Sequence, residues 1–189
     1  MRINEIFTSI QGEGHFTGVP AVFVRTSGCN LHCSFCDTKH DNDTEMSAES
    51  IVDEISKTIY HHVVITGGEP TLQPDLPQLV ERLHERGYFI QIETNGTRPV
   101  PPHIDWVTCS PKDLQRTIVT QPNELKVVYQ GQDMTPYEQI FHAEVLSLQP
   151  CDTGDETRNK EILDATLSYI LRHPEWHLSL QTHKMIGVR

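Results

Sequence analysis

The chain of 189 residues is poor in basic residues and has no long apolar run, and each deficit excludes a class of function. Its 15 lysines and arginines stand against 26 aspartates and glutamates, which gives a formal net charge of −11 at pH 7. Such a chain offers no positive surface to nucleic-acid backbones or anionic lipids. No apolar stretch could span a bilayer, and the first residues lack the basic start and apolar core of an export signal. We therefore predict a cytoplasmic protein with no nucleic-acid or membrane partner.

Cysteine is also scarce, and its distribution is uneven. Three of the five cysteines, Cys29, Cys33 and Cys36, lie within eight residues, whereas Cys109 and Cys151 are far apart. In a reducing compartment these thiols are expected to be free or to bind metal rather than to form disulfides. A chain of this length can bury a core that needs no disulfide or metal. We expect a single domain over residues 1–189.

Short β-rich runs alternate with helical patterns, which is typical of a mainly parallel sheet. We expect strands at 21–26, 63–66, 89–94, 106–110, 124–129, 144–149 and 177–181. We expect helices at 50–59 behind an N-cap at Ser47, at 76–86 ended by Gly87, and at 156–173 stopped by Pro174. Segment 97–105 carries too many prolines to be helical. A closed barrel of eight strands normally needs about 200 residues or more. The sequence therefore predicts a partial, open parallel β/α barrel, a reduced TIM-like fold with a thin helical layer.

Polar residues follow most of the expected strands. Because chemistry in parallel β/α folds gathers where the strands end, these residues are expected to share one face. They are Arg25, the TGGEP segment 66–70, the ETNG segment 93–96, the SPK segment 110–112, and Gln149 with Pro150.

The cysteine cluster has the spacing C-x3-C-x2-C and lies just beyond the first expected strand. Three thiolates can hold three irons of a [4Fe-4S] cubane and leave the fourth iron open. A zinc module, with His32 or His40 as fourth ligand, is an alternative, although structural zinc sites usually have two separated ligand pairs. An iron-sulfur electron carrier is a second alternative, but it would need a fourth ligand. We expect Cys109 and Cys151 to be small core residues outside the cluster.

This spacing, with Phe35 before the last cysteine, resembles the signature of the radical S-adenosylmethionine (SAM) superfamily. The resemblance implies that SAM binds the open iron and is cleaved to methionine and a 5′-deoxyadenosyl radical, while the protein orients and shields the reactants. It also implies a set of SAM-binding residues. Gly67, Gly68 and Glu69 would meet the methionine moiety, with Glu69 receiving its ammonium group. Phe35 and Asp37 would face the adenosine half, Ser110 and Lys112 the ribose or carboxylate, and Gln149 the adenine.

Further motifs resemble the 7-carboxy-7-deazaguanine synthase family within that superfamily. They are IFTSIQGEG at 6–14, GVP at 18–20, Arg25, the CDT segment 36–38 and the ending QTHKMIGVR. The resemblance implies a homodimeric, magnesium-dependent lyase. Its reaction would be conversion of 6-carboxy-5,6,7,8-tetrahydropterin to 7-carboxy-7-deazaguanine with loss of ammonia, on the route to queuosine. A flavodoxin-like or ferredoxin-like protein would supply electrons.

The residue chemistry suits a pterin that carries a carboxylate. Gln11, Gly12 and Glu13 lie where acceptors and donors could pair with the amino and amide edge of the pterin, and Arg25 can bind a carboxylate through two hydrogen bonds. The resemblance places the Thr38 hydroxyl on Mg²⁺, a hard ion that prefers oxygen ligands. It also places Thr66, His183 and Arg189 near the substrate.

Several points stay open at this level. Glu93 and Asn95 are candidates to line the cavity. The polar segment 39–46 is short, which puts secondary contacts to substrate or reductase in doubt. A glycyl-radical-activating enzyme is the main rival within the superfamily, and the QGEG and QTHK segments argue against it.

Overall fold

The computed structural model describes residues 1–38 and 43–189, and a mostly parallel sheet forms its centre. Within these residues the strand order is β3-β1-β2-β4-β5-β6-β7-β8-β9. In this order, each neighbouring pair from β2 through β4 to β9 is parallel, whereas β1 pairs antiparallel with both β2 and β3. Their bounds are β1 Arg2–Ile10, β2 Pro20–Thr26, β3 Thr44–Glu45, β4 His62–Gly67, β5 Phe89–Thr94, β6 Trp106–Cys109, β7 Glu124–Tyr129, β8 Val145–Pro150 and β9 Trp176–Leu178.

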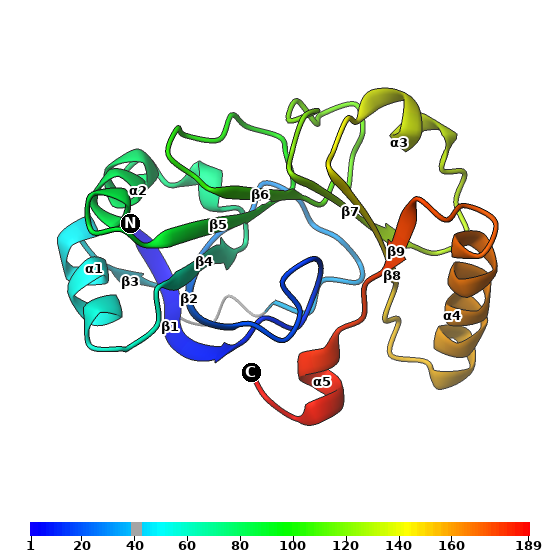
Figure 1. Cartoon of the computed structure of the whole chain (residues 1–189), viewed down its shortest axis with the longest axis horizontal. Coiled ribbons are helices and arrows are strands. Elements are labelled where there is room, and N and C mark those ends of the chain that lie inside the picture. Colours follow the sequence, from blue (N-terminus) through cyan, green and yellow to red (C-terminus); the bar gives the residue numbers. More distant parts are fainter. Residues whose placement is uncertain (39–42) are drawn as a thin grey trace.

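The helices cover the outside of the curved sheet unevenly. Figure 1 shows α1 and α2 at one end and α3 and α4 at the other, while α5 lies on the opposite, open side. The connections from β5 to β6 and from β6 to β7 contain no helix, so the helical layer is thin, and the predicted open parallel β/α barrel is confirmed. The helices are α1 Ala48–Ser56, η1 Pro70–Leu72, α2 Leu76–Glu85, α3 Thr135–Ile140, α4 Glu156–Ile170 and α5 Thr182–Ile186.

The predicted helix boundaries are confirmed where a local cap sets them. The Ser47 hydroxyl accepts a hydrogen bond from the Ser50 amide at 3.1 Å and so begins α1. Gly87 follows α2 with a φ of 74°, the left-handed conformation that glycine adopts at helix ends. The helices α1 and α4 end three residues before their predicted last residues, at Ser56 and Ile170. The prediction missed β1, β3, α3 and α5, which are short or lack a continuous apolar run.

The core lies between the sheet and its outer helices. On β2, β4 and β5, alternate residues face outward and pack against α1 and α2. A second cluster joins β6 to β9 with α3 and α4. Because the sheet uses this outer face for its core, the other face of each strand is left for polar side chains. Within the part of the chain that the structure describes, no helix has the length and apolar character needed to cross a membrane.

Candidate active site

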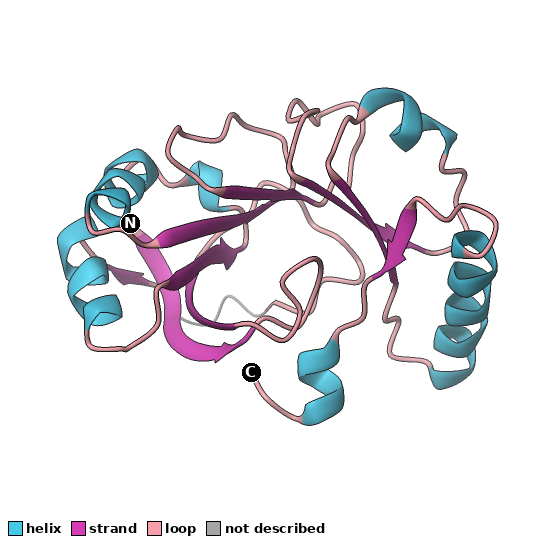
Figure 2. Ribbon diagram, viewed as in Figure 1, coloured by secondary structure: helices cyan, strands magenta, loops and turns pink. Residues whose placement is uncertain are grey.

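The sheet curves around an open interior (Figure 2). Alternation along its strands turns polar side chains toward this interior, because the apolar residues between them belong to the outer core. On β5, Ile90 and Ile92 belong to the outer core, so Gln91 and Glu93 point the other way. On β7, Leu125 and Val127 pack outward, which turns Glu124 and Lys126 inward. The inner face is therefore a polar site walled by an apolar shell.

Two adjoining cavities occupy this interior. The larger has a volume of about 440 Å³ and the smaller about 220 Å³. The predicted substrate and magnesium residues all line the larger one: Gln11, Gly12, Glu13, Arg25, Thr38, Thr66, His183 and Arg189. The three cluster cysteines line the smaller one, as do most of the predicted SAM residues: Phe35, Asp37, Gly67, Gly68, Ser110, Lys112 and Gln149. The residues common to both cavities are Glu13, Asp37, Thr38, Thr66, Glu93, Lys126 and Lys184.

The cysteine loop leaves the end of β2 and presents three thiols to the smaller cavity. The loop is held by a bond from the Cys36 amide to the Cys33 carbonyl at 3.2 Å. Burial raises the pKa of the Cys33 thiol, Lys112 opposes this, and the neighbouring Cys29 and Cys36 add to it. A cluster site needs three thiols that face one cavity, and this loop provides them.

The other two cysteines differ from one another. Cys109 is fully buried under Gly96 and does not line the smaller cavity, and burial raises its pKa to about 12. It is the small core residue that the sequence predicts. Cys151 is 3% exposed, yet it does border the smaller cavity. It is thus buried as predicted for a small core residue, and in addition it forms part of the cavity wall.

The two glycines of TGGEP allow the end of β4 to pack against backbone. A Cβ on Gly67 would lie 2.2 Å from the Thr26 carbonyl oxygen, and one on Gly68 would lie 2.0 Å from that of Gly28. The backbone bond from Glu69 to Gly28, 2.9 Å long, ties β4 to the cysteine loop. Close approach of backbone to backbone thus requires glycine here.

Glu69 does not face the cavity as the sequence suggested. Its side chain is fully buried and absent from the lining of either cavity. The carboxylate accepts bonds from the Thr71 amide and hydroxyl, the Thr94 hydroxyl and the Asn95 amide, at 2.6 to 3.1 Å. It therefore joins η1 to the end of β5 and is not free to meet an ammonium group without breaking these bonds.

The remaining SAM candidates have polar partners around the smaller cavity. The Lys112 ammonium donates to the carbonyl and hydroxyl of Ser110, and burial lowers the pKa of Lys112. Gln149 Oε1 accepts a bond from the Ser179 hydroxyl at 3.0 Å. Glu93 and Asn95, the two further candidates, also line this cavity.

Arg25 and Arg189 share a carboxylate at the edge of the larger cavity. Arg25 Nε donates to Glu5 Oε1 at 2.9 Å, and Arg189 Nη2 donates to the other Glu5 oxygen. The Phe7 ring lies beneath both guanidinium groups, 5.6 and 4.9 Å from their carbons. Glu5 takes the Nε edge of Arg25, and among residues 1–38 and 43–189 no hydrogen bond occupies the two terminal nitrogens, so these can bind a ligand.

The C-terminal segment crosses the open side of the barrel. The Thr182 amide donates to the Gly12 carbonyl at 2.9 Å, and a Cβ on Gly12 would lie 2.1 Å from the His183 ring. Lys184 forms ion pairs with Asp37 at 2.8 Å and Asp152 at 3.2 Å. These contacts bridge β1, the cysteine loop and the end of β8, so α5 closes the site.

Known proteins resemble this chain over its whole length. The Radical SAM superfamily model matches residues 23–107. A 7-carboxy-7-deazaguanine synthase of Bacteroides thetaiotaomicron is 52% identical, and the match covers 100% of this chain and 98% of the relative. A 7-carboxy-7-deazaguanine synthase of Haemophilus influenzae is 38% identical, and the match covers 98% of this chain and 93% of the relative. The crystal structure of QueE from Escherichia coli has a TM-score of 0.72, is 30% identical, and covers 96% of this chain and 94% of its own.

The chain belongs to the 7-carboxy-7-deazaguanine synthase family. The family predicted from the sequence is confirmed, and with it the radical SAM type of enzyme, whose cofactors are a [4Fe-4S] cluster and SAM. The residues present fit these groups, because three thiols line a cavity continuous with a glycine-rich strand end and a buried lysine. Family membership favours a synthase over the glycyl-radical-activating enzyme, the electron carrier and the zinc module.

Several residues of this synthase-family site were missed in the sequence. Glu5, Lys126, Gln181 and Lys184 make ionic or hydrogen-bonded contacts within the site. For Lys126 the sequence does contain a signal, because Glu124 and Lys126 alternate with the apolar Leu125 and Val127 along a strand. His40 and the residues 39–42 of the short polar segment lie outside the described residues.

Proposed function

We propose that this chain is a radical SAM lyase that converts 6-carboxy-5,6,7,8-tetrahydropterin to 7-carboxy-7-deazaguanine with loss of ammonia, in the synthesis of 7-deazapurines such as queuosine. The observation that carries the proposal is the junction of the two cavities. The cavity with the cysteines opens beside the one with Gln11, Glu13 and Arg25, so a radical made in one can reach a ligand held in the other.

The smaller cavity is the proposed cofactor site. Cys29, Cys33 and Cys36 hold the cluster, and the cluster with SAM supplies, when bound, the 5′-deoxyadenosyl radical that abstracts a substrate hydrogen. Backbone groups of Gly67 and Gly68 meet the methionine part. The burial of Glu69 favours a supporting role for its carboxylate in place of the direct ammonium contact. The other proposed SAM contacts are Phe35, Asp37, Ser110, Lys112 and Gln149.

The larger cavity is the proposed substrate site. Arg25 binds the substrate carboxylate through its terminal nitrogens, while Glu5 fixes the guanidinium from behind. Gln11 and Glu13 bind the amino and amide edge of the pterin. Gly12, Thr66, His183 and Arg189 complete the wall. A site with such paired groups rejects analogues that lack the matching donors.

Thr38 is the proposed magnesium ligand. It is partly buried and borders both cavities, so its hydroxyl and the substrate carboxylate could share one ion. Magnesium keeps several waters and needs few protein oxygens, which fits a single hydroxyl. We further propose a homodimer, a flavodoxin-like or ferredoxin-like reductant and a cytoplasmic location.

The test is reconstitution of the cluster under anaerobic conditions, followed by addition of SAM, dithionite, magnesium and the carboxy-tetrahydropterin. The proposal predicts 5′-deoxyadenosine together with a product of the mass of 7-carboxy-7-deazaguanine. Cofactor cleavage without that product would exclude the substrate, and no cleavage at all would favour an electron carrier or a zinc module.

Substitutions of single residues test the proposed roles of Arg25 and of the cluster cysteines. Arg25→Ala is expected to raise KM roughly 10- to 100-fold, because a hydrogen bond to a charged group contributes about 1.5–3 kcal/mol. Slow uncoupled cofactor cleavage should remain. Cys33→Ala is expected to abolish both activities, whereas Cys109→Ala, a thiol outside the cavity, should keep the cluster. Normal turnover in Arg25→Ala would contradict the carboxylate contact.

A further inference from the structure

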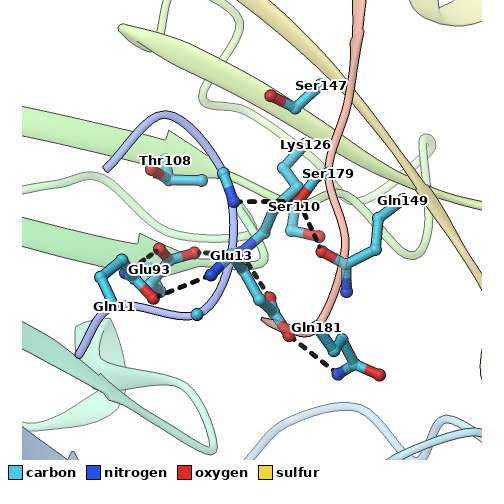
Figure 3. Close-up of polar contacts among 12 residues, drawn as sticks. Gln11, Glu13, Glu93, Thr108, Ser110, Lys126, Ser147, Gln149, Ser179 and Gln181 are labelled. Atoms are coloured by element: carbon cyan, nitrogen blue, oxygen red, sulfur yellow. Dashed lines mark hydrogen bonds and ion pairs between the residues drawn. The ribbon is translucent and has the colours of Figure 1, made fainter. Parts of the chain in front are cut away.

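A buried lysine that belongs to none of the motifs lies between the two cavities. Lys126 is in β7, and only 5% of it is exposed. Its ammonium group donates to Glu13 Oε2 at 2.8 Å and to Glu93 Oε2 at 2.9 Å (Figure 3). These side chains come from the loop after β1, from β5 and from β7, and each lines both cavities. One ammonium group thus joins three parts of the interior.

The carboxylates are also held by neutral donors. Glu13 Oε1 accepts a bond from Gln181 Nε2 at 2.8 Å, and Glu93 Oε1 accepts from Gln91 at 2.9 Å and from Gln11 at 3.3 Å. A carboxylate has about four lone-pair sites, so Glu13 keeps acceptor capacity for a ligand while its orientation is fixed from two sides.

Removing the positive charge would change both carboxylates. Glu13 and Glu93 would then share a buried region without the cation that contacts both of them, and burial together with mutual repulsion favours protonation. A protonated carboxyl group presents a donor where the ionised group only accepts. The ammonium group therefore decides which hydrogen bonds Glu13 can make.

We propose that Lys126 is a positioning residue that keeps the Glu13 carboxylate ionised and aimed into the larger cavity, where it accepts hydrogen bonds from the amino and amide N–H groups of the substrate. The inference rests on the proposed function, because it takes the pterin as the ligand of Glu13. Lys126 acts through Glu13 and needs no contact with the substrate.

The electrostatics agree with this geometry. Burial by itself raises the pKa of Glu13, but the charge and hydrogen bond of Lys126 outweigh it and, with Gln181 and His183, hold the pKa at about 2. Burial raises the pKa of Glu93 to about 7, because Lys126 offsets it only in part. The charged or titratable groups around Glu13 and its partner Lys126 are Glu93, Glu124, Lys112, His183, Lys184 and Asp37.

The test is a double-mutant cycle on substrate affinity. The cluster-loaded chain, with SAM and magnesium but no reductant, does not turn over, so calorimetry gives the Kd of the carboxy-tetrahydropterin. Lys126→Met should raise this Kd roughly 30-fold or more, which is typical of truncating one partner of a buried charge pair. In the Glu13→Gln background the side chain at position 13 carries no charge for Lys126 to compensate, so the same change should raise Kd by less than about threefold. Lys160→Met, on the exposed face of α4, is the matched control and should change nothing.

The pH profile gives a second readout that a purely structural role would not move. Without Lys126 the pKa of Glu13 rises, so the ionised form is lost as pH falls through the raised value. The ratio of variant to wild-type Kd should therefore grow as the pH falls, because wild-type Glu13, with its pKa at about 2, stays ionised.

The inference is overturned if Lys126→Met raises Kd by the same factor in the wild-type and Glu13→Gln backgrounds and the ratio of variant to wild-type Kd does not change with pH. The proposed function would then remain intact. If the wild-type chain does not bind the pterin at all, the proposed function fails and the inference falls with it. Thermal midpoint and iron content check folding. If Lys126→Met does not fold, Lys126→Gln, which keeps a donor without a charge, carries the same cycle.

Discussion

Replacing Gly68 with alanine tests how closely the end of β4 must pack against the cysteine loop. The added Cβ would lie 2.0 Å from the Gly28 carbonyl oxygen, and the shortest separation that Cβ atoms show is 3.0 Å, so the peptide before Cys29 must move by about 1 Å. Overpacking of this kind costs about 1–3 kcal/mol, and loss of the bond from the Glu69 amide to Gly28 adds about 1 kcal/mol. We expect the free energy of unfolding to fall by about 2–4 kcal/mol.

The displacement should also weaken cluster binding. We expect Gly68→Ala to hold less iron per chain after reconstitution and to show a weaker visible absorbance of the cluster. Gly87→Ala is the matched control: its φ is 74° and its Cβ would meet nothing within 4 Å, so it should cost about 1–2 kcal/mol in urea unfolding with no loss of iron. If Gly68→Ala bound full iron with unchanged stability, the close packing of β4 against the loop would not be a requirement of the site.

Two further substitutions test the substrate side. Gly12→Ala should displace the His183 ring, which a Cβ would approach to 2.1 Å, and raise KM for the pterin with little change in uncoupled cofactor cleavage; an unchanged KM in steady-state assays would exclude a role for His183. Glu5→Gln should raise KM several-fold by loosening Arg25, and because the amide oxygen can still accept the Arg25 hydrogen bond the unfolding free energy should fall by about 1 kcal/mol. A larger loss of stability, measured by urea denaturation, would mean that Glu5 serves the fold more than the site.

Some of the site could be predicted from local sequence because its chemistry is local. The spacing of Cys29, Cys33 and Cys36 on one loop is sufficient to present three thiols to one group. The alternation of β-rich and helical runs, with caps at Ser47 and Gly87, is likewise a property of neighbouring residues. The gathering of polar strand ends followed from the parallel sheet, because the carboxyl ends of its strands meet on one face.

Contacts between distant residues needed the tertiary structure. Glu13 and Lys126 are 113 positions apart, and Glu5 and Arg189 are 184 apart, so no sequence window contains both members of either pair.

Glu69 shows that a local motif can also suggest a wrong position for a side chain. Its place after two glycines suggested an open carboxylate, yet the register of β4 beside β5 turns it toward Thr94 and Asn95. The sequence by itself determined the cofactor loop and most strands of the parallel sheet, since periodicity and spacing are local. Only the tertiary structure decided which buried charges meet. Strand order and curvature bring β5, β7, the C-terminal segment and the loop that follows β1 to one point.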